Sequence, residues 1–260
     1  MARGSQVDKV LVTRPAGQAE GLCQLLHDAG YSVLHEPLMR LEALAELSAV
    51  QRQQLLDLDT YQHLIFVSAN AVRYGMERIA DYWPQLPVGL NWYGVGAATA
   101  SLLRDYGIPV TAPEQAMDSE ALLALPALRS VAGDKVLIVR GEGGRTLLRE
   151  ELQRRNARVE DFPCYRRLCP QIPPGELARR LQQAKVTVIM ISSGEGLVNL
   201  LALLSREETT KFRDTVLIVP SSRVAQMAVD AGFGAVVTAA NASDAAMLRA
   251  LQDWTTGSGD

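Results

Sequence analysis

Short apolar runs rich in valine and isoleucine alternate along the chain with stretches whose apolar positions recur at helical spacing. The runs are VLVT (10–13), LIFVS (64–68), VLIVR (136–140), VIMIS (188–192), VLIV (216–219) and AVVT (235–238). Strands that are apolar on both faces are typical of parallel sheets covered by helices. Regular alternation of strand and helix predicts right-handed βαβ units. We therefore expect an α/β protein with small, doubly wound, flavodoxin-like parallel sheets.

The pattern occurs twice, because the chain matches itself at a shift of about half its length. Residues 9–40 align with residues 135–166 without a gap and are identical at ten positions, among them Arg14 and Arg140. Unrelated segments of this length would share about two identities. The match indicates that one α/β unit was duplicated.

The rest of the chain continues the repeat. HLIFVSANAV resembles TVIMISSGEG, which pairs Ile65 with Ile189 and Ser68 with Ser192, and a third segment pairs Thr99 with Val224. The order of segments is thus A, B, C, A′, B′, C′. With 260 residues, the chain is long enough for two domains of about 100–150 residues each.

The turns from strand to helix supply the candidate binding residues. In doubly wound sheets a ligand lies beyond the carboxyl ends of the strands, where helix N-termini point backbone N–H groups outward. Small and hydroxyl residues there let a ligand approach the backbone, although each serine could equally serve as a helix N-cap. The candidates are Thr13, Arg14, Ser68, Ala69, Asn70, Gly96, Thr99, Arg140, Gly141, Ser192, Ser193, Gly194 and Ser222.

Composition narrows the function classes. The net charge of −3 argues against a nucleic-acid-binding protein, which normally carries a basic face or tail. No apolar stretch reaches the roughly 18 residues that a membrane span needs, and the N-terminus lacks the apolar core of a signal peptide. We expect a cytoplasmic protein without a membrane partner. Three cysteines and three histidines show no ligand spacing, so we expect reduced thiols and no metal site.

Two glycine-rich motifs do not meet the requirements of nucleotide sites. GVGAAT (94–99) lacks the third small residue of a dinucleotide fingerprint. GEGGR (141–145) lacks the Lys and Ser or Thr that follow the glycines of a phosphate loop. A chance match and a flexible turn entering a helix are the better interpretations.

Together, the motifs resemble those of the uroporphyrinogen-III synthase family, over almost the whole chain. Individually weak, they are specific in their order and spacing. They are VLVTRP (10–15), FVSANAV (66–72), YGVGAATA (93–100), VLIVRGEGGR (136–145), EDFPCYRR (160–167), ISSGEGLVNL (191–200) and the closing VPSSRVAQMAVDAGF.

The resemblance implies a discontinuous first domain. That domain would comprise residues 1–36 and 168–260, the second domain would comprise 41–163, and 37–40 and 164–167 would be linkers. Two crossings of the chain make a hinge, so the resemblance also implies an interdomain cleft that opens and closes.

The reaction implied is the cyclisation of hydroxymethylbilane, a linear tetrapyrrole, to uroporphyrinogen III with loss of water and inversion of the last pyrrole ring. No cofactor is implied, and a monomer is the expected state. Because the uncatalysed chain closes to the uninverted isomer, such an enzyme must control geometry more than supply a strong acid or base.

Arginines suit a substrate that carries many carboxylates. Arg14 and Arg140 stand at matched repeat positions after a strand, so we expect them to hold carboxylates, with hydrogen bonding to loop carbonyls as the structural alternative. Other arginines near the turns are Arg73 and Arg145, which are further candidates, and Arg40, Arg166 and Arg167, which we expect to be solvated.

Tyr165 is the first candidate for the chemistry that the resemblance implies. It matches a family tyrosine that faces the cleft, and its phenol could assist departure of the substrate hydroxyl. The alternative is that Tyr165 packs the hinge and only positions substrate. Thr99 matches a family threonine at a helix start, whereas Val224 stands at the equivalent position of the other domain. This departure favours a grip by backbone N–H groups.

Two other function classes remain open at this point. A hinged, non-catalytic binding protein shares doubled α/β domains and linker crossings. A response-regulator-like half would carry clustered acids at strand ends, but Thr13, Ser68, Val139 and Ser192 stand there.

Overall fold

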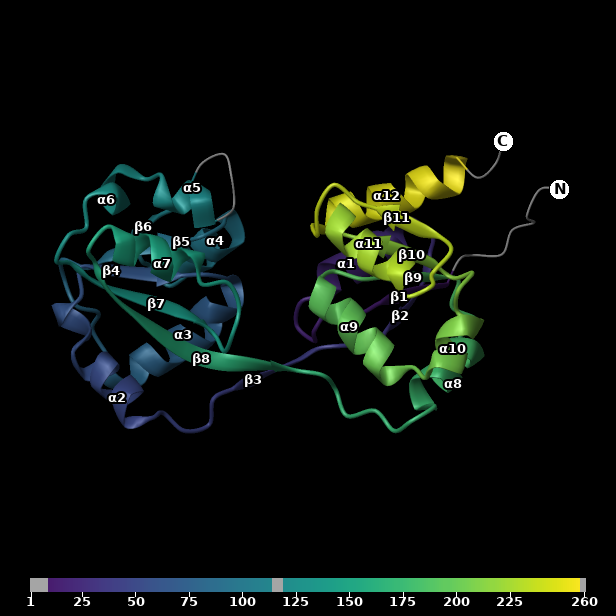
Figure 1. Cartoon of the computed structure of the whole chain (residues 1–260), viewed down its shortest axis with the longest axis horizontal. Helices are drawn as coiled ribbons and strands as arrows, with labels where there is room; N and C mark the ends of the chain where they lie inside the picture. Colours follow the sequence, from purple (N-terminus) through teal and green to yellow (C-terminus); the bar gives the residue numbers. More distant parts are fainter. Residues whose placement is uncertain (1–8, 114–118, 258–260) are drawn as a thin grey trace. The chain divides into compact units, whose positions relative to one another are not determined.

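The computed structural model describes residues 9–113 and 119–257, which fold into two α/β units (Figure 1). Unit 1 comprises Met1–Arg40 and Leu168–Asp260, and unit 2 comprises Leu41–Arg167. The chain therefore leaves unit 1 after its first βαβ segment, builds the whole of unit 2, and returns. The N-terminal segment judged for a signal peptide lies mostly outside the described residues.

Unit 1 contains a five-stranded parallel sheet in the order β11-β10-β9-β1-β2. Its strands are β1 (Lys9–Val12), β2 (Ser32–His35), β9 (Val188–Met190), β10 (Val216–Val219) and β11 (Val236–Thr238). Its helices are α1 (Glu20–Asp28), α8 (Glu176–Gln183), α9 (Gly194–Leu203), α10 (Arg206–Lys211), α11 (Ser222–Asp230) and α12 (Asp244–Gly257).

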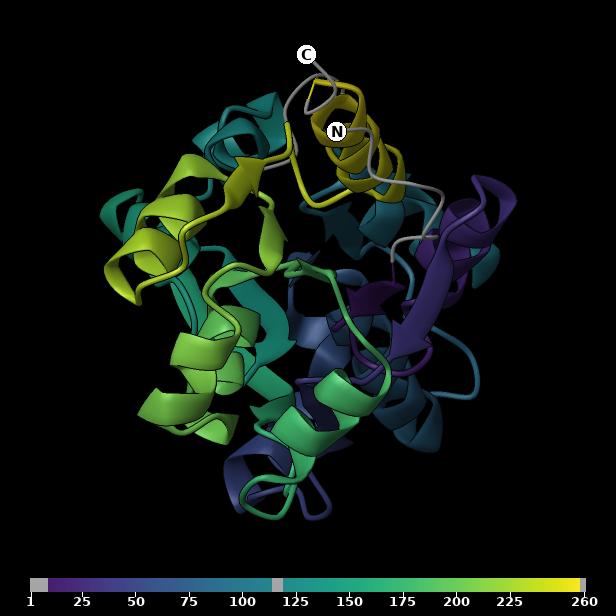
Figure 2. The same ribbon diagram turned by 90° about the vertical axis from the view of Figure 1, so that its right-hand side faces the viewer.

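Helices cover both faces of this sheet, because its strands are apolar on both sides. One face packs against α8, α9 and α11, whose buried residues include Leu177 and Leu200. The other packs against α1 and α12 through residues such as Leu22 and Met247 (Figure 2). Successive residues of β1 alternate between the two cores, Leu11 in the first and Val10 in the second.

Unit 2 contains a six-stranded sheet in the order β3-β8-β7-β4-β5-β6, of which β8 to β6 are parallel. Its strands are β3 (Arg40–Ala43), β4 (His63–Phe66), β5 (Asn91–Gly94), β6 (Val110–Thr111), β7 (Lys135–Gly141) and β8 (Arg158–Leu168). Its helices are α2 (Ala49–Leu56), the 3₁₀ helix η1 (Leu58–Thr60), α3 (Ala69–Tyr82), α4 (Ala97–Asp105), α5 (Ser119–Leu123), α6 (Pro126–Arg129) and α7 (Leu147–Arg154).

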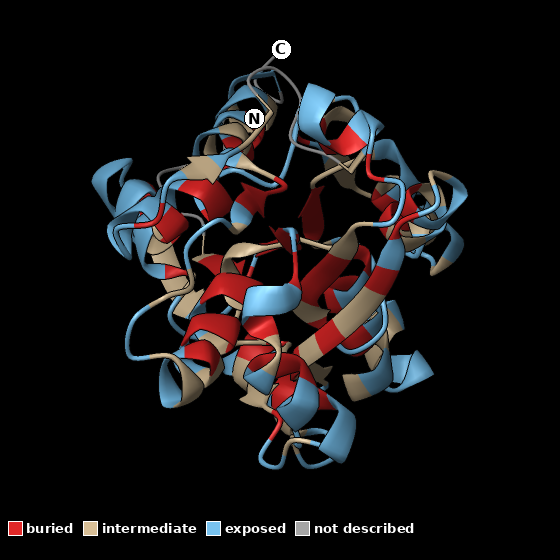
Figure 3. Cartoon of the chain, turned by 90° about the vertical axis from the view of Figure 1, so that its left-hand side faces the viewer, coloured by how far each residue is buried: buried red, intermediate tan, exposed pale blue. Residues whose placement is uncertain are grey.

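The second sheet is also covered on both faces. Buried residues of α2, α3 and α4 form one core and those of α5, α6 and α7 the other. Figure 3 shows this unit with the buried residues on the strands and on the helix sides that meet them. The prediction of an α/β protein with parallel sheets is confirmed.

The sheet register corrects one part of the repeat alignment. Leu11 and Leu137, which match in the repeat, lie opposite Ile189 and Leu64 respectively. Ile189 therefore corresponds to Leu64, and the pairing with Ile65 is wrong by one residue. Both alignments put a large aliphatic residue in a buried strand, so the apolar pattern did not distinguish them.

Residues 164–167, expected as a linker, continue strand β8. Cys164 and Tyr165 are buried, and the Glu142 N–H donates to the Tyr165 carbonyl at 2.8 Å, which extends the pairing with β7. The strand ends at Leu168 because the following segment, CPQIPP, contains Pro170 and two further prolines before α8.

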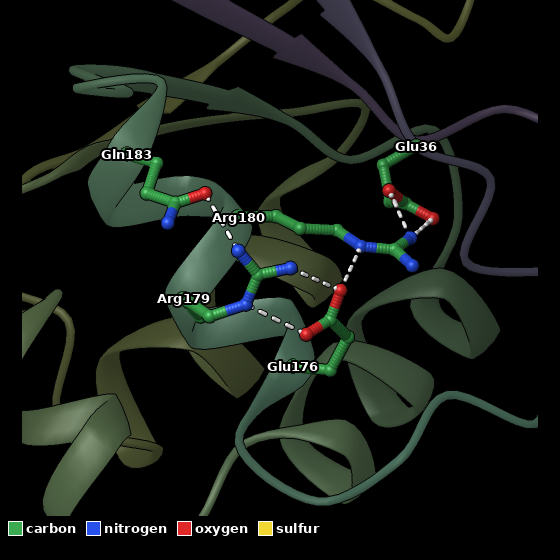
Figure 4. A network of polar contacts seen from close by, with 5 residues as sticks. All are labelled: Glu36, Glu176, Arg179, Arg180 and Gln183. Carbon is green, nitrogen blue, oxygen red and sulfur yellow. Dashed lines mark hydrogen bonds and ion pairs between the residues drawn. The ribbon is translucent and has the colours of Figure 1, made fainter.

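An ion-pair network joins the end of β2 to α8 within unit 1 (Figure 4). Both carboxylate oxygens of Glu36 accept from Arg180 Nη1, at 2.9 and 2.8 Å. Glu176 accepts from Arg180 Nε at 2.8 Å and from Arg179, which also donates to Gln183. The hydrogen bonds from Arg179 and Arg180 lower the pKa of the Glu176 carboxyl to about 2. The network ties the residue preceding the first crossing to the helix that follows the second.

Candidate functional site

The carboxyl edges of both sheets carry the starts of helices, as the turn residues predicted. Ser68, Ser193 and Ser221 are the N-caps of α3, α9 and α11, and each accepts a hydrogen bond from the N–H three residues on, at 3.1, 3.1 and 3.4 Å. Gly96 caps α4 without a side-chain hydrogen bond. Ser222, the candidate chosen from the sequence, is instead the exposed first residue of α11. The capping serine there is therefore one residue away from the predicted one.

This capping pattern also settles the serine pairing between the repeats. Ser68 and Ser193 occupy the same place in their units, so the expected pairing of Ser68 with Ser192 is wrong. Ser192 has a different part, since its hydroxyl accepts a hydrogen bond from an arginine of the neighbouring turn.

That arginine is Arg14, whose side chain is only 13% exposed. Its Nε donates to Ser192 Oγ at 3.1 Å, its Nη2 donates to the Ala242 carbonyl at 2.6 Å, and its Nη1 forms an ion pair with Asp244. Gly21 of α1 permits this arrangement, because a Cβ there would lie 2.6 Å from Asp244 Oδ2. Arg14 thus connects the turns that follow three strands of unit 1.

Arg140 is also held by groups of its own unit. Its side chain is 12% exposed, and its Nη2 donates to the carbonyls of Gly143 and Arg145 at 2.5 and 3.0 Å. Its Nη1 lies 3.7 Å from Asp161 Oδ1. Arg14 thus bonds to groups of neighbouring turns and Arg140 to carbonyls of its own loop, which corresponds to the structural alternative considered for them.

Tyr165 lies at the carboxyl edge of unit 2 with its ring buried and 2% exposed. The ring stacks on Tyr74 at 5.2 Å between centroids, and its hydroxyl lies 3.3 Å from Ser68 Oγ, with either group able to donate. A Cβ on Gly141 would lie 2.7 Å from Tyr165 Cζ, so the ring occupies the space that any larger residue at 141 would need. The structure thus brings together Ser68, Gly141 and Tyr165.

The remaining candidates of unit 1 are held by their own backbone surroundings. Thr13 is buried and donates to the Met190 carbonyl at 2.7 Å. Gly194 begins α9, and a Cβ there would lie 3.2 Å from Arg223 Nη2. Arg223 was not among the sequence candidates, and an arginine two residues after a capping serine is the signal that would have indicated it.

The remaining candidates of unit 2 lie in the first turns of α3 and α4. Thr99 is buried at 4% exposure, while Ala69 and Asn70 are half-buried. Arg73 Nη1 donates to Asn70 Oδ1 at 3.2 Å, so two of the candidate binding residues are hydrogen-bonded to each other.

The described residues offer little for other chemistries. Residues 9–113 and 119–257 contain no group of three His, Cys, Asp or Glu side chains placed to hold a metal ion. All three cysteines are free, and burial raises the pKa of the Cys164 thiol to about 12. None of the helices described is both long enough and apolar enough to span a bilayer.

Sequence comparison relates this chain to named proteins. The family model described as uroporphyrinogen-III synthase HemD matches residues 20–249. The uroporphyrinogen-III synthases of Escherichia coli K12 and Salmonella typhimurium LT2 are 33% and 34% identical to this chain. Each match extends over 249 residues, which is 94% of this chain and 99% of the relative. That of Proteus mirabilis is 35% identical over 194 residues, 74% of this chain and 97% of its own.

Solved structures agree on the fold. Uroporphyrinogen III synthase of Thermus thermophilus, in a mutant form, superposes with a TM-score of 0.60 at 18% identity and covers 95% of this chain and 100% of its own. The Helicobacter pylori 26695 enzyme has a TM-score of 0.58 at 15% identity, with 96% and 100% covered. Given the family match across most of its length, the chain belongs to the uroporphyrinogen-III synthase family.

Proposed function

We propose that the protein closes hydroxymethylbilane to uroporphyrinogen III, as a cyclising lyase of tetrapyrrole and haem biosynthesis, and that the carboxyl edges of both sheets hold the substrate. The observation that carries the activity is the match of nearly the entire chain to proteins that bear this name. A non-catalytic hinged binding protein is not favoured, since the same relatives are enzymes.

The chemistry places its main demand on geometry. Protonation of the terminal hydroxymethyl group lets it depart as water and leaves an azafulvenium cation as the electrophile. The substituted carbon of the far ring attacks it to form a spiro-pyrrolenine, which fragments and recloses with that ring inverted. Since direct closure competes without any enzyme, the protein must hold both ends of the chain so that the substituted carbon is the one that reacts.

Strand order supports duplication of a flavodoxin-like unit. Read in repeat order, unit 1 has its strands as 2-1-3-4-5 from β2 to β11, and unit 2 has the same order from β8 to β6. This is the doubly wound order whose ligands lie at the carboxyl edge, where the order reverses. Both units therefore present equivalent edges to one substrate class.

Backbone N–H groups at these edges suit a polyanionic substrate. The first four N–H groups of a helix have no partner within it, and the helix dipole favours an anion there. Serine caps satisfy one such group in α3, α9 and α11, whereas α4 begins at Gly96 without a side-chain cap and with Ala97 and Ala98 exposed. We assign α4 a backbone contact with a substrate carboxylate.

Tyr165 and Ser68 form a pair of hydroxyl groups at the carboxyl edge of the sheet in unit 2. Their oxygens lie 3.3 Å apart at the start of α3, and neither carries a formal charge. The phenol would donate its proton to the departing hydroxyl, which leaves as water, and the phenolate would regain a proton when ring closure releases one. We assign Arg14 and Arg140 to positioning, because their guanidinium groups hold the turns that present the N–H groups.

Incubation with freshly generated hydroxymethylbilane, followed by identification of the isomer formed, tests the activity. We expect uroporphyrinogen III, and the uninverted isomer at the rate seen without protein would reject the proposal. Tyr165→Phe keeps the ring and removes the hydroxyl, so it should slow turnover while the product stays the inverted isomer. Unchanged turnover would remove Tyr165 from the mechanism.

We also propose that the protein is a cytoplasmic monomer, acts on this small molecule and does not bind nucleic acid.

A further inference from the structure

Five arginines gather on two adjoining segments of unit 2. In residues 140–149 and 161–167, the only charged residues besides these arginines are two acidic residues. The segments are the end of β7 with the turn into α7, and the second half of β8, which pairs with β7. The arginine cluster consists of Arg140, Arg145, Arg149, Arg166 and Arg167, and the acids are Glu142 and Asp161.

The repeat shows that part of this charge is particular to unit 2. Arg145 and Arg149 align with Ala19 and Cys23 in unit 1, whereas Arg140 and Arg166 align with Arg14 and Arg40. Arg149 pairs with Asp161, whose counterpart in unit 1 is His35, so a contact inside unit 2 accounts for it. Within the described part of the chain Arg145 has no such contact, and it points to a task that one unit performs and the other does not.

Two members of the cluster are used inside the unit. Arg140 closes the loop through the carbonyls of Gly143 and Arg145, and Arg149 Nε lies 3.0 Å from Asp161 Oδ2. Asp161 is shared by both arginines, since Arg140 Nη1 is 3.7 Å from its other oxygen. The two cations thus have one carboxylate between them.

The other members lie around the loop that Arg140 closes. Arg166 is 42% exposed at its side chain, with Nε 3.6 Å from Glu142 Oε2, and Arg167 Nη2 lies 3.5 Å from the Glu142 carbonyl. Arg145 is exposed, and its guanidinium makes no hydrogen bond or ion pair with any residue that the structure describes. Gly144 is at φ +90°, and a Cβ there would lie 3.1 Å from Arg140 Nη2 and 3.8 Å from Arg167 Nη2.

We propose that the arginine cluster binds a carboxylate side chain of the tetrapyrrole substrate, with Arg145 and Arg166 as its direct ligands. This inference rests on the proposed function and specifies which unit supplies side-chain cations to it. Several guanidinium groups around two carboxylates repel one another, and a bound anion relieves that repulsion. Arg140 and Arg149 hold the loop in place, while Arg166, expected to be only solvated, takes part in binding.

The test compares KM for hydroxymethylbilane among Arg145→Ala, Arg166→Ala and the double variant. Arg154→Ala is the matched control, since Arg154 is an exposed arginine at the far end of α7 and its loss changes the net charge equally. We expect KM to rise about 2-fold to 5-fold for each single variant and about 5-fold to 20-fold for the double variant, as for exposed ion pairs. The value of kcat should change less than about twofold, because the carboxylate is held equally in ground and transition states.

Salt dependence separates binding from a general loss of structure. Raising ionic strength from about 0.05 to about 0.2 M should raise KM of the wild type and Arg154→Ala more than that of the double variant. A double variant that matches Arg154→Ala in KM and in salt dependence, while the wild type still forms the inverted isomer, overturns this inference alone. A wild type that forms only the uninverted isomer overturns the proposed function instead.

Discussion

Replacing Gly141 by alanine would test whether the ring of Tyr165 leaves room for a side chain at position 141. Gly141 is in β7 at a φ that any residue can adopt, so alanine meets no backbone strain. Its Cβ would however lie 2.7, 2.9 and 3.1 Å from three carbon atoms of the Tyr165 ring. Carbon atoms pack best at about 3.5–4.0 Å, so the ring must move by several tenths of an ångström or more. Such a movement would separate it from Ser68 and Tyr74.

The expected cost follows from two opposing contributions. Overpacking of a buried site costs about 1–3 kcal/mol, and Tyr165 is 2% exposed and stacked, so it has little room to yield. Replacing glycine by alanine in the absence of strain stabilises a protein by about 0.4–1 kcal/mol through the unfolded chain. We therefore expect Gly141→Ala to destabilise unit 2 by about 1–2 kcal/mol, and to slow turnover if the Tyr165 hydroxyl takes part.

Denaturant unfolding followed by tryptophan fluorescence measures this effect in the correct unit. Trp83 and Trp92 lie in unit 2 and Trp254 in unit 1, so a Trp254→Phe background reports on unit 2 alone. In a Tyr165→Leu background the clashing ring atoms are absent, and Gly141→Ala should then be neutral or stabilising by up to about 1 kcal/mol. Equal destabilisation in both backgrounds would refute the argument that the ring excludes a side chain at 141.

Two further predictions follow from shifted pKa values. Hydrogen bonds from Arg179 and Arg180 lower the pKa of Glu176 from its usual 4.5 to about 2, so the stabilisation that this carboxylate gives is present above the unfolded-state pKa and is lost as the pH falls through about 2. In a carboxyl NMR titration, Arg180→Ala should raise this pKa toward 4.5, and an unchanged value would contradict the assignment. Burial raises the pKa of the Cys164 thiol to about 12, so at a pH of about 8 a thiol reagent should modify exposed Cys169 and spare Cys164 until unit 2 unfolds. If peptide mapping finds rapid modification of Cys164 in the native protein, the Cys164 thiol is not buried as described.

The parallel sheets could be predicted from the sequence because their central strands are buried on both faces. Runs such as 136–140 and 216–219 are apolar almost throughout, and only a sheet covered on both sides accommodates them. Strand β8 was not found in this way, since RVEDFPCYRRL mixes charges with buried Phe162 and contains a proline. Its neighbours on both sides hold it in the sheet, and no local pattern contains that information.

The candidate site shows the same limit at single-residue resolution. Small and hydroxyl residues at strand ends indicated which turns begin helices, but not which of two adjacent serines is the cap. At 192–193 and at 221–222 either serine has the required chemistry, and the backbone geometry at the end of the strand selects the second in one case and the first in the other. The same ambiguity produced the error of one residue in the repeat alignment.

The sequence by itself predicted a duplication and determined the α/β class and the family resemblance, because identities and apolar periodicity are properties of the chain order. Only the tertiary structure decided what the matched residues do. We expected Arg14 and Arg140 to hold substrate carboxylates. Arg14 instead bonds to a carbonyl and a carboxylate of other turns of unit 1, and Arg140 bonds to carbonyls of its own loop and lies near Asp161. Tyr165 and Gly141 are far apart in the sequence, and no periodic pattern links them. The register of β8 on β7 alone puts the ring over the glycine. Contacts of this kind depend on distances between strands that no single segment specifies.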